Sequence, residues 1–297
     1  MKDAKEKYLS YYEQESKTWP VLYEDIFIET SYGRTFIRKS GSKELPALVL
    51  LAGSMSTSLM WKASVEVLSK EYCVYTIDNI YDVGLSVQDV AMKSADDLTT
   101  WLNEVFIRLQ LNNNVNLLGI SYSGWVASQF ALKYANKLNK LILIAPAATV
   151  LPIESKFIIK SLWMLLPFKY FTKRFFDWLL NDMAQKSEIS KHELDRYIGE
   201  ILFYKKCFGN QFLINPSVLS DEELKNFKTQ TLFLVGENEK MYSAKEAVKR
   251  VVALNPAIEY ELVHDVGHDL FFLKQKYIIN RVLSFITNTH VDHSCLC

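Results

Sequence analysis

The chain has 297 residues, enough for one large domain or two small ones, and an apolar content of 49% allows it to bury a substantial core. Its 34 lysines and arginines are balanced by 34 aspartates and glutamates, so there is no excess of positive charge to neutralise a phosphate backbone. Composition therefore argues against a nucleic-acid partner and against global disorder.

The terminal and most apolar segments carry no targeting or membrane signal. Residues 1–17 are charged and polar and lack the apolar stretch of a secretory signal peptide, which predicts a cytoplasmic location. The apolar region 157–180 is interrupted by Pro167 and several charges, which argues against a membrane span. The four cysteines have no framework spacing, so we expect them to remain thiols.

Helical and strand-like segments alternate along the chain. The expected strands cover 24–30, 35–39, 47–51, 72–77, 115–120, 140–145, 231–235 and 259–263, and the expected helices cover 2–19, 95–109, 122–134, 243–252 and 270–286. Continuously apolar strands that alternate with helices are typical of a parallel sheet covered on both faces. The pattern predicts an α/β fold with a mostly parallel sheet of about eight strands and helices on both faces.

One long segment interrupts this alternation. Residues 147–228 are rich in aromatic side chains and mostly helical in character. We therefore expect a core formed by 1–146 and 229–297, with 147–228 inserted as a helical cap over one edge of the sheet.

A serine stands at the junction between a predicted strand and a predicted helix. The segment Gly119-Ile120-Ser121-Tyr122-Ser123 has the small-x-Ser-x-small form of a nucleophile elbow, a tight and strained turn that exposes a reactive serine. Ser123 stands where glycine is usual, although Gly124 follows. The bare pattern often arises by chance, so it is the strand-to-helix position that favours Ser121 as a nucleophile.

A serine nucleophile needs a base, usually a histidine oriented by a carboxylate. In a nucleophile-elbow hydrolase these residues follow one another along the chain in the order serine, acid, histidine. His268, in the loop after the last predicted strand, fits the third place and is our candidate base. His264 is more consistent with packing or hydrogen bonding. The acid is expected in the loop after strand 231–235, where Glu239 is the first choice and Glu237 its rival.

A nucleophile of this kind also needs N–H groups to stabilise a developing oxyanion. The N–H of Tyr122, at a helix N-terminus, is one candidate. The second is expected in the loop after strand 47–51, with the N–H of Ser54 as first choice and that of Met55 as second.

Taken together, these motifs resemble the α/β-hydrolase superfamily over about residues 24–285. Segment 51–61 is similar to the family's His-Gly loop with Ala52 in place of histidine, and Glu239 stands where aspartate is commoner. The stretch Pro146-Ala-Ala-Thr-Val-Leu-Pro152 further resembles bacterial carboxylesterases. This resemblance implies an α/β-hydrolase fold with a mobile lid.

The implied activity is that of a serine hydrolase that cleaves a carboxylic ester of a small or medium apolar substrate through an acyl-enzyme. We expect no metal or organic cofactor, and Met55 and Trp163 are the expected substrate contacts. Thioesters, lactones, carbon–carbon bonds and cyanohydrins remain alternatives, because fold does not determine substrate. A non-catalytic ligand receptor is the second class of function considered.

Two further interpretations concern the cap and the tail. Basic residues among the cap aromatics, including Lys173 and Arg174, could contact an anionic membrane, although the neutral net charge disfavours this. The His- and Cys-containing tail 290–297 could bind a metal, but a frayed terminus is the more consistent interpretation. Acyl chain length and oligomeric state are not specified by the sequence.

Overall fold

The strands of the protein form a single mixed sheet in a computed structural model that describes residues 2–166, 168–209, 211 and 213–287. Within these residues the order is β1-β2-β4-β3-β6-β7-β8-β9, and β5 (Val87–Gln88) pairs with β2. The strands on this path are β1 (Tyr23–Thr30), β2 (Gly33–Ser40), β3 (Ala47–Leu51), β4 (Cys73–Ile77), β6 (Val115–Ile120), β7 (Leu138–Ile144), β8 (Gln230–Gly236) and β9 (Glu259–Val263). The β1-β2 hairpin and the β2-β4 pair are antiparallel, whereas the pairs from β4 to β9 are parallel.

The parallel strands are apolar throughout because both faces of the sheet are covered. In β3, Leu48 and Leu50 belong to one hydrophobic cluster and Val49 and Leu51 to the other, as the two-residue period of a strand requires. All four side chains are fully buried. A strand buried on both faces shows no polar alternation, which is why its sequence is a continuous apolar run.

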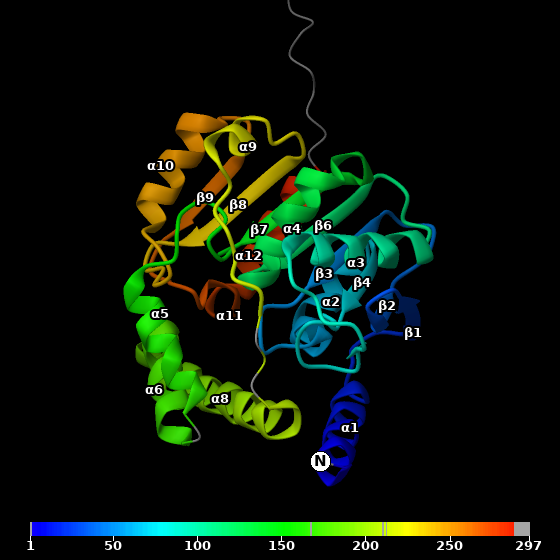
Figure 1. Cartoon of the computed structure of the whole chain (residues 1–297), viewed down its shortest axis with the longest axis vertical. Coiled ribbons are helices and arrows are strands. Elements are labelled where there is room, and N and C mark those ends of the chain that lie inside the picture. Colours follow the sequence, from blue (N-terminus) through cyan, green and yellow to red (C-terminus); the bar gives the residue numbers. More distant parts are fainter. Residues whose placement is uncertain (1, 167, 210, 212, 288–297) are drawn as a thin grey trace, which may run out of the picture.

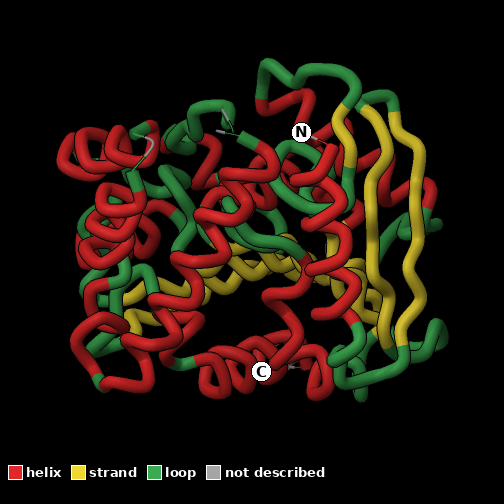
Figure 2. The backbone as a smooth tube through the Cα atoms, turned by 90° about the horizontal axis from the view of Figure 1, so that it is seen from below, coloured by secondary structure: helices red, strands yellow, loops and turns green. Residues whose placement is uncertain are grey.

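Helices cover the two faces of the sheet, and Figure 2 shows them on either side of the strands. One face is covered by α3 (Ala95–Arg108), α4 (Tyr122–Lys133) and α10 (Ala244–Leu254), and the other by α2 (Lys62–Leu68) and α12 (Gln275–Thr287). The expected helix 270–286 is broken at Lys274 into α11 (Leu270–Leu273) and α12, because Lys274 leaves the helical region of φ and ψ.

The insertion between β7 and β8 contains most of the remaining helices. They are α5 (Ser155–Ser161), η3 (Leu162–Leu165), α6 (Lys169–Leu179), α7 (Asn181–Lys186), α8 (Glu188–Phe208) and α9 (Asp221–Lys225). The cluster of α6, α7 and α8 has its own apolar core that includes Phe175, Phe176 and Ile201. By contrast, α9 packs against α10 of the main domain, and Leu224 lies in the sheet-side core. Figure 1 shows α5, α6 and α8 set apart from the sheet.

The N-terminal helix α1 (Lys2–Ser16) lies between the insertion and the main domain. Its Tyr8 packs edge-on against Tyr204 and Phe208 of α8. Tyr12, one turn further on, packs edge-on against Phe36 of β2. The helix therefore links α8 of the insertion to the sheet, and Figure 1 shows it beside α8.

The predicted fold class is confirmed, and the strands predicted at 47–51, 115–120 and 259–263 have the bounds expected. The sequence did not predict β5, α2 or the short turns η1 (Ser58–Trp61) and η2 (Ala135–Lys137), since a helix of about two turns or fewer and a strand of two residues show too little periodicity. Within the described residues, no helix is long and apolar enough to cross a membrane.

Candidate active site

Ser121 occupies the sharp turn between β6 and α4. Its φ of 54° and ψ of −119° are rare for a residue with a side chain, and such strain is typical of functional turns. The turn requires glycine at 119, because a Cβ there would stand 2.3 Å from the Ser123 carbonyl oxygen. The Ser121 carbonyl accepts a hydrogen bond from Ala147 N–H at 2.9 Å, and this contact helps to hold the turn.

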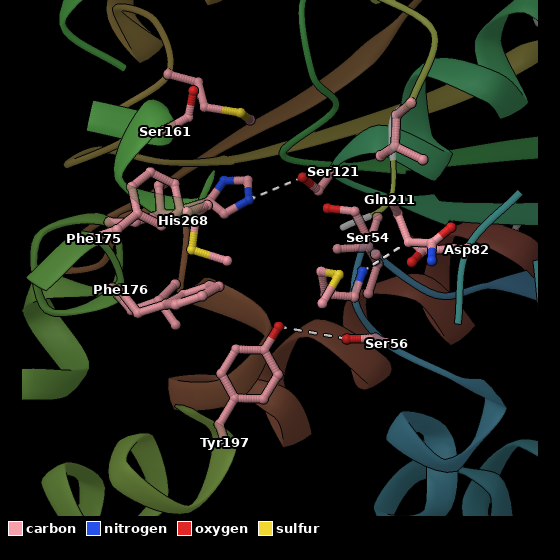
Figure 3. A pocket seen from close by; sticks show the side chains of 18 of the residues that line it. Ser54, Ser56, Asp82, Ser121, Ser161, Phe175, Phe176, Tyr197, Gln211 and His268 are labelled. Carbon is pink, nitrogen blue, oxygen red and sulfur yellow. Dashed lines mark hydrogen bonds between the residues drawn. The ribbon is translucent and has the colours of Figure 1, made fainter. Parts of the chain in front are cut away.

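A histidine and a carboxylate form a hydrogen-bonded chain with this serine. His268 Nε2 lies 3.0 Å from Ser121 Oγ, and His268 Nδ1 lies 2.9 Å from Glu239 Oε2. The other carboxylate oxygen of Glu239 accepts the N–H groups of Lys240 and Met241 at 2.8 and 2.9 Å. The Glu239 side chain is fully shielded from solvent and that of His268 is 10% exposed. Figure 3 shows His268 directed at Ser121 across the cavity.

The loops that carry these two residues pack closely. A Cβ on Gly236 would stand 2.3 Å from the Gly267 carbonyl oxygen, so glycine is required at 236 for β8 to approach the histidine loop. Asp269, which follows the histidine, accepts the N–H of Gly267 at 3.0 Å and that of Met183 at 2.6 Å. This buried carboxylate ties the histidine loop to helix α7 of the insertion.

Glu237, the rival acid, lies elsewhere. Its carboxylate pairs with His264 Nδ1 at 3.0 Å and with Lys245 Nζ at 3.1 Å at the surface. The structure therefore places Glu239, and not Glu237, against His268, and gives His264 the hydrogen-bonding role expected for it. Asp265, the carboxylate three residues before His268, is exposed and lies in a turn with a φ of 59°.

Two opposing effects set the pKa of His268. Burial is the largest and lowers the pKa, because it disfavours the charged imidazolium. The charge of Glu239, its hydrogen bond and the charge of Asp269 act in the opposite direction and together outweigh burial, so the pKa of His268 is raised above its ordinary 6.5. An imidazole held in this way accepts a proton more readily than a buried histidine without a carboxylate partner.

The candidate N–H donors lie close to the serine. Tyr122 is the first residue of α4, and N–H groups in the first turn of a helix have no acceptor within that helix. The loop 52–55 lies beside the nucleophile, since a Cβ on Gly53 would stand 3.8 Å from Ser121 Cβ. In the described part of the chain the Ser54 N–H has no hydrogen-bond acceptor, whereas the Met55 N–H donates to Asp82 Oδ2 at 2.8 Å. Ser54 is thus the better candidate of the two.

Behind the elbow, the residue that departs from the usual glycine has polar partners. The Ser123 hydroxyl donates to the Ala52 carbonyl, and Tyr81 OH lies 3.0 Å from Ser123 Oγ. Asn79 Nδ2 donates both to Ala52 O at 2.9 Å and to Ser123 Oγ at 3.1 Å. Sequence reasoning missed Asn79, Tyr81 and Asp82. Their position after β4, at the carboxyl edge next to β3, is the signal that could have identified them.

A cavity of about 310 Å³ opens over Ser121 and His268. Its lining is mostly apolar and includes Phe157, Phe175 and Phe176 of the insertion. Figure 3 shows Phe175 and Phe176 across the cavity from Ser54. Trp163, an expected substrate contact, does not line this cavity, whereas the adjacent Met164 does. The Trp163 ring lies instead under the cations of Lys160 and Arg174, at 4.4 and 5.5 Å from its centroid.

The basic cap residues considered for membrane contact have protein partners. Lys173 pairs with Asp177 at 2.9 Å and with Asp195 at 2.8 Å. Among the residues that the structure describes, no group of three or more His, Cys, Asp or Glu side chains is placed to hold a metal ion. The candidate metal-binding tail 290–297 lies outside the described residues.

Comparison with known proteins agrees with the fold. Residues 48–276 match the family described as the alpha/beta hydrolase family, and the chain belongs to it. Carboxylesterase YbfK of Bacillus subtilis is 28% identical and covers 93% of this chain and 92% of its own length. A second B. subtilis relative, described as an uncharacterized carboxylesterase, nap, is 27% identical, and the match covers 94% of this chain and 92% of the relative.

Solved structures show the same similarity in three dimensions. The B. subtilis carboxylesterase CesB (YbfK) superposes with a TM-score of 0.85 at 26% identity, over 96% of this chain and 99% of that one. The B. subtilis naproxen esterase gives a TM-score of 0.84 at 26% identity with the same coverage. The predicted resemblance to bacterial carboxylesterases is therefore confirmed.

Proposed function

We propose that this protein is a carboxylic ester hydrolase that acts through a Ser121-His268-Glu239 triad and an acyl-enzyme. The observation that carries the proposal is the hydrogen-bonded chain from Ser121 Oγ through His268 to Glu239, at 3.0 and 2.9 Å, facing an apolar cavity. Full-length relatives described as carboxylesterases support the same activity.

In the first half of the reaction, Ser121 Oγ attacks the ester carbonyl while His268 Nε2 takes its proton. The new C–O bond produces a tetrahedral oxyanion, which the N–H groups of Tyr122 and Ser54 stabilise. Glu239 holds the imidazole in the tautomer that leaves Nε2 free to accept the proton and stabilises the imidazolium that forms. His268 then returns the proton to the departing alcohol, and the acyl group remains on Ser121.

In the second half, a water molecule takes the place of the alcohol. His268 removes a proton from this water, which attacks the acyl carbonyl through a second tetrahedral oxyanion. Collapse of this intermediate breaks the bond to Ser121 Oγ, and His268 delivers the proton to the serine. The products are a carboxylic acid and a regenerated hydroxyl, so no redox partner is involved.

The cavity favours a small or medium apolar ester. About 310 Å³ lined mainly by Phe, Met and Leu side chains is in the size range of small-molecule pockets. Because both curated relatives are described as carboxylesterases, an ester is favoured over a thioester, a lactone or a carbon–carbon bond, and over a non-catalytic receptor. We continue to expect a cytoplasmic location and no nucleic-acid partner.

We infer that the insertion 147–228 acts as the lid of this site. Its helices α5, α6 and α8 contribute Phe157, Phe175 and Tyr197 to the cavity wall, so they determine which substrates reach Ser121. Closing such a lid excludes water during acylation. Because α9 packs on α10, the part expected to move is α5 to α8.

Labelling with a fluorophosphonate probe tests this function. We expect the wild type to be labelled and to hydrolyse p-nitrophenyl butyrate, and Ser121→Ala to do neither. Ser128→Ala is the matched control, because Ser128 is a buried serine of α4, the helix that follows Ser121, and does not line the cavity. Absence of both labelling and hydrolysis in the wild type would overturn the proposal.

A further inference from the structure

A buried carboxylate lies beside the candidate oxyanion loop. Asp82 follows β4, is 8% exposed and lines the same cavity as Ser121 (Figure 3). Within the described residues it forms no ion pair, and burial raises its pKa to about 7. Since an unpaired carboxylate in an apolar site costs stability, its presence there calls for a function.

The contacts of Asp82 are with backbone N–H groups. One oxygen accepts the Met55 N–H at 2.8 Å and the other accepts the Val83 N–H at 2.8 Å. The first contact joins two loops that are 27 residues apart in sequence, the loop after β4 and the loop after β3. Both loops lie at the carboxyl edge of neighbouring parallel strands.

The residue that Asp82 contacts has an unfavourable backbone conformation. Met55 has a φ of 57°, in the left-handed region that side chains other than glycine rarely adopt. Such a conformation persists only where the surroundings hold it. The hydrogen bond from Met55 N–H to Asp82 is a contact that can do so, and Asn79 holds the other end of the same loop through Ala52 O.

These contacts divide the N–H groups of the loop between two tasks. The Met55 N–H is taken by Asp82, and the Ser54 N–H next to it has no acceptor within the described residues. The preceding Gly53 lies against Ser121, so this part of the loop is the part that faces the nucleophile.

We propose that Asp82 is a positioning residue for the oxyanion hole, which fixes the turn at Met55 so that the Ser54 N–H is directed at the developing oxyanion. This inference rests on the proposed ester hydrolysis. Asp82 itself does not transfer a proton in this scheme. A negative charge near a developing oxyanion is unfavourable, so what the site needs from residue 82 is a hydrogen-bond acceptor rather than a charge.

The test compares Asp82→Ala with Asp82→Asn in the full chain, with rates normalised by active-site titration so that only folded enzyme is counted. Alanine leaves the Met55 N–H without an acceptor. We expect kcat to fall about 10- to 100-fold while KM stays nearly unchanged. The upper end of this range equals the smallest loss of kcat that is typical when one oxyanion donor is removed, about 100-fold. Asparagine retains one oxygen that can accept the Met55 N–H, so it should restore most of kcat.

A trifluoromethyl ketone provides a readout that a purely structural role would not change. Such ketones form a tetrahedral oxyanion on the serine, so their affinity should fall in Asp82→Ala in proportion to kcat/KM. Asp78→Asn is the control, because Asp78 is a buried carboxylate of the same loop that does not line the cavity. The Asp78→Asn variant should have the same titrated kcat and the same ketone affinity as the wild type.

Two results would overturn the inference while leaving ester hydrolysis intact. In the first, titrated Asp82→Ala keeps its kcat and its ketone affinity. In the second, KM rises while kcat is unchanged, which would make Asp82 a substrate contact. Failure of the proposed function is a separate result, because the wild type would then hydrolyse no ester.

Discussion

The Ser123 hydroxyl donates a hydrogen bond to the Ala52 carbonyl, which joins the first turn of α4 to the loop beside the nucleophile. These residues are the two positions at which the elbow and the His-Gly loop depart from the commoner family pattern. Asn79 and Tyr81 also bond to Ser123, so the hydroxyl is the centre of a buried polar cluster.

Replacing Ser123 with the glycine that is commoner in the family should therefore lower both the stability and the activity of this protein. Ser123→Gly removes the shared partner of Asn79 and Tyr81, and we expect unfolding free energy to fall by about 1–3 kcal/mol. The kcat for p-nitrophenyl butyrate should also fall, because Ala52 begins the loop 52–55 that carries Ser54, the proposed oxyanion donor. Denaturant unfolding and steady-state kinetics measure both effects. Ser123→Ala separates loss of the hydroxyl from the flexibility of glycine, and equal or higher stability and activity in both variants would contradict the prediction.

Substitutions at the two glutamates after β8, Glu239 and Glu237, test which carboxylate is the acid of the triad. Glu239→Gln places an amide against His268 Nδ1 and favours the wrong tautomer, so kcat should fall by about 100-fold or more, as for other triad acids. Glu237→Gln breaks only surface contacts to His264 and Lys245 and should retain nearly full activity. Rates on p-nitrophenyl butyrate decide between them, and the reverse result would assign the acid to Glu237.

The pH dependence of kcat/KM follows from the raised pKa of His268. The base must be neutral to accept the serine proton, so activity should rise with pH and reach its midpoint above 6.5. In Glu239→Gln the charge that raises this pKa is lost, whereas burial, which lowers it, remains. The midpoint of the residual activity should then move to lower pH. A wild-type midpoint below 6.5, or no shift in the variant, would show that the carboxylate does not control this imidazole.

Tyr197 and five other residues line both the cavity over Ser121 and a second cavity of about 450 Å³ beside α1. The Tyr197 ring forms part of the wall between them, and its hydroxyl lies 3.5 Å from Ser56 Oγ (Figure 3). Tyr197→Ala should join the two cavities and raise the ratio of kcat/KM for long acyl chains to kcat/KM for short ones by about 10-fold. This is the lower end of the discrimination that one methylene gives in an apolar pocket.

Chain-length profiles of p-nitrophenyl esters measure this change in preference. Tyr197→Phe keeps the ring and loses only the hydroxyl contact, so its profile should match that of the wild type. An unchanged profile in Tyr197→Ala would mean that the ring does not limit acyl length.

Several elements of the fold were predictable because their signal is local. The continuous apolar run of β3 and the periodicity of α3 specify a buried strand and an amphipathic helix without reference to the rest of the chain. The helix α2, with about two turns, and the strand β5, with two residues, were missed because each is too short for its own type of element to show a period. The break at Lys274 was also missed, because α11 and α12 share one apolar pattern.

The sequence by itself determined the order of the elements and, through the common carboxyl edge of parallel strands, which loops carry Ser121, His268 and the candidate acids. It did not determine which glutamate meets the histidine, that Trp163 lies outside the cavity, or that Asp82 contacts Met55. These outcomes depend on loop conformations and on contacts between residues far apart in the chain. Side-chain direction in a loop has no period in the sequence, so only the packed structure decides it.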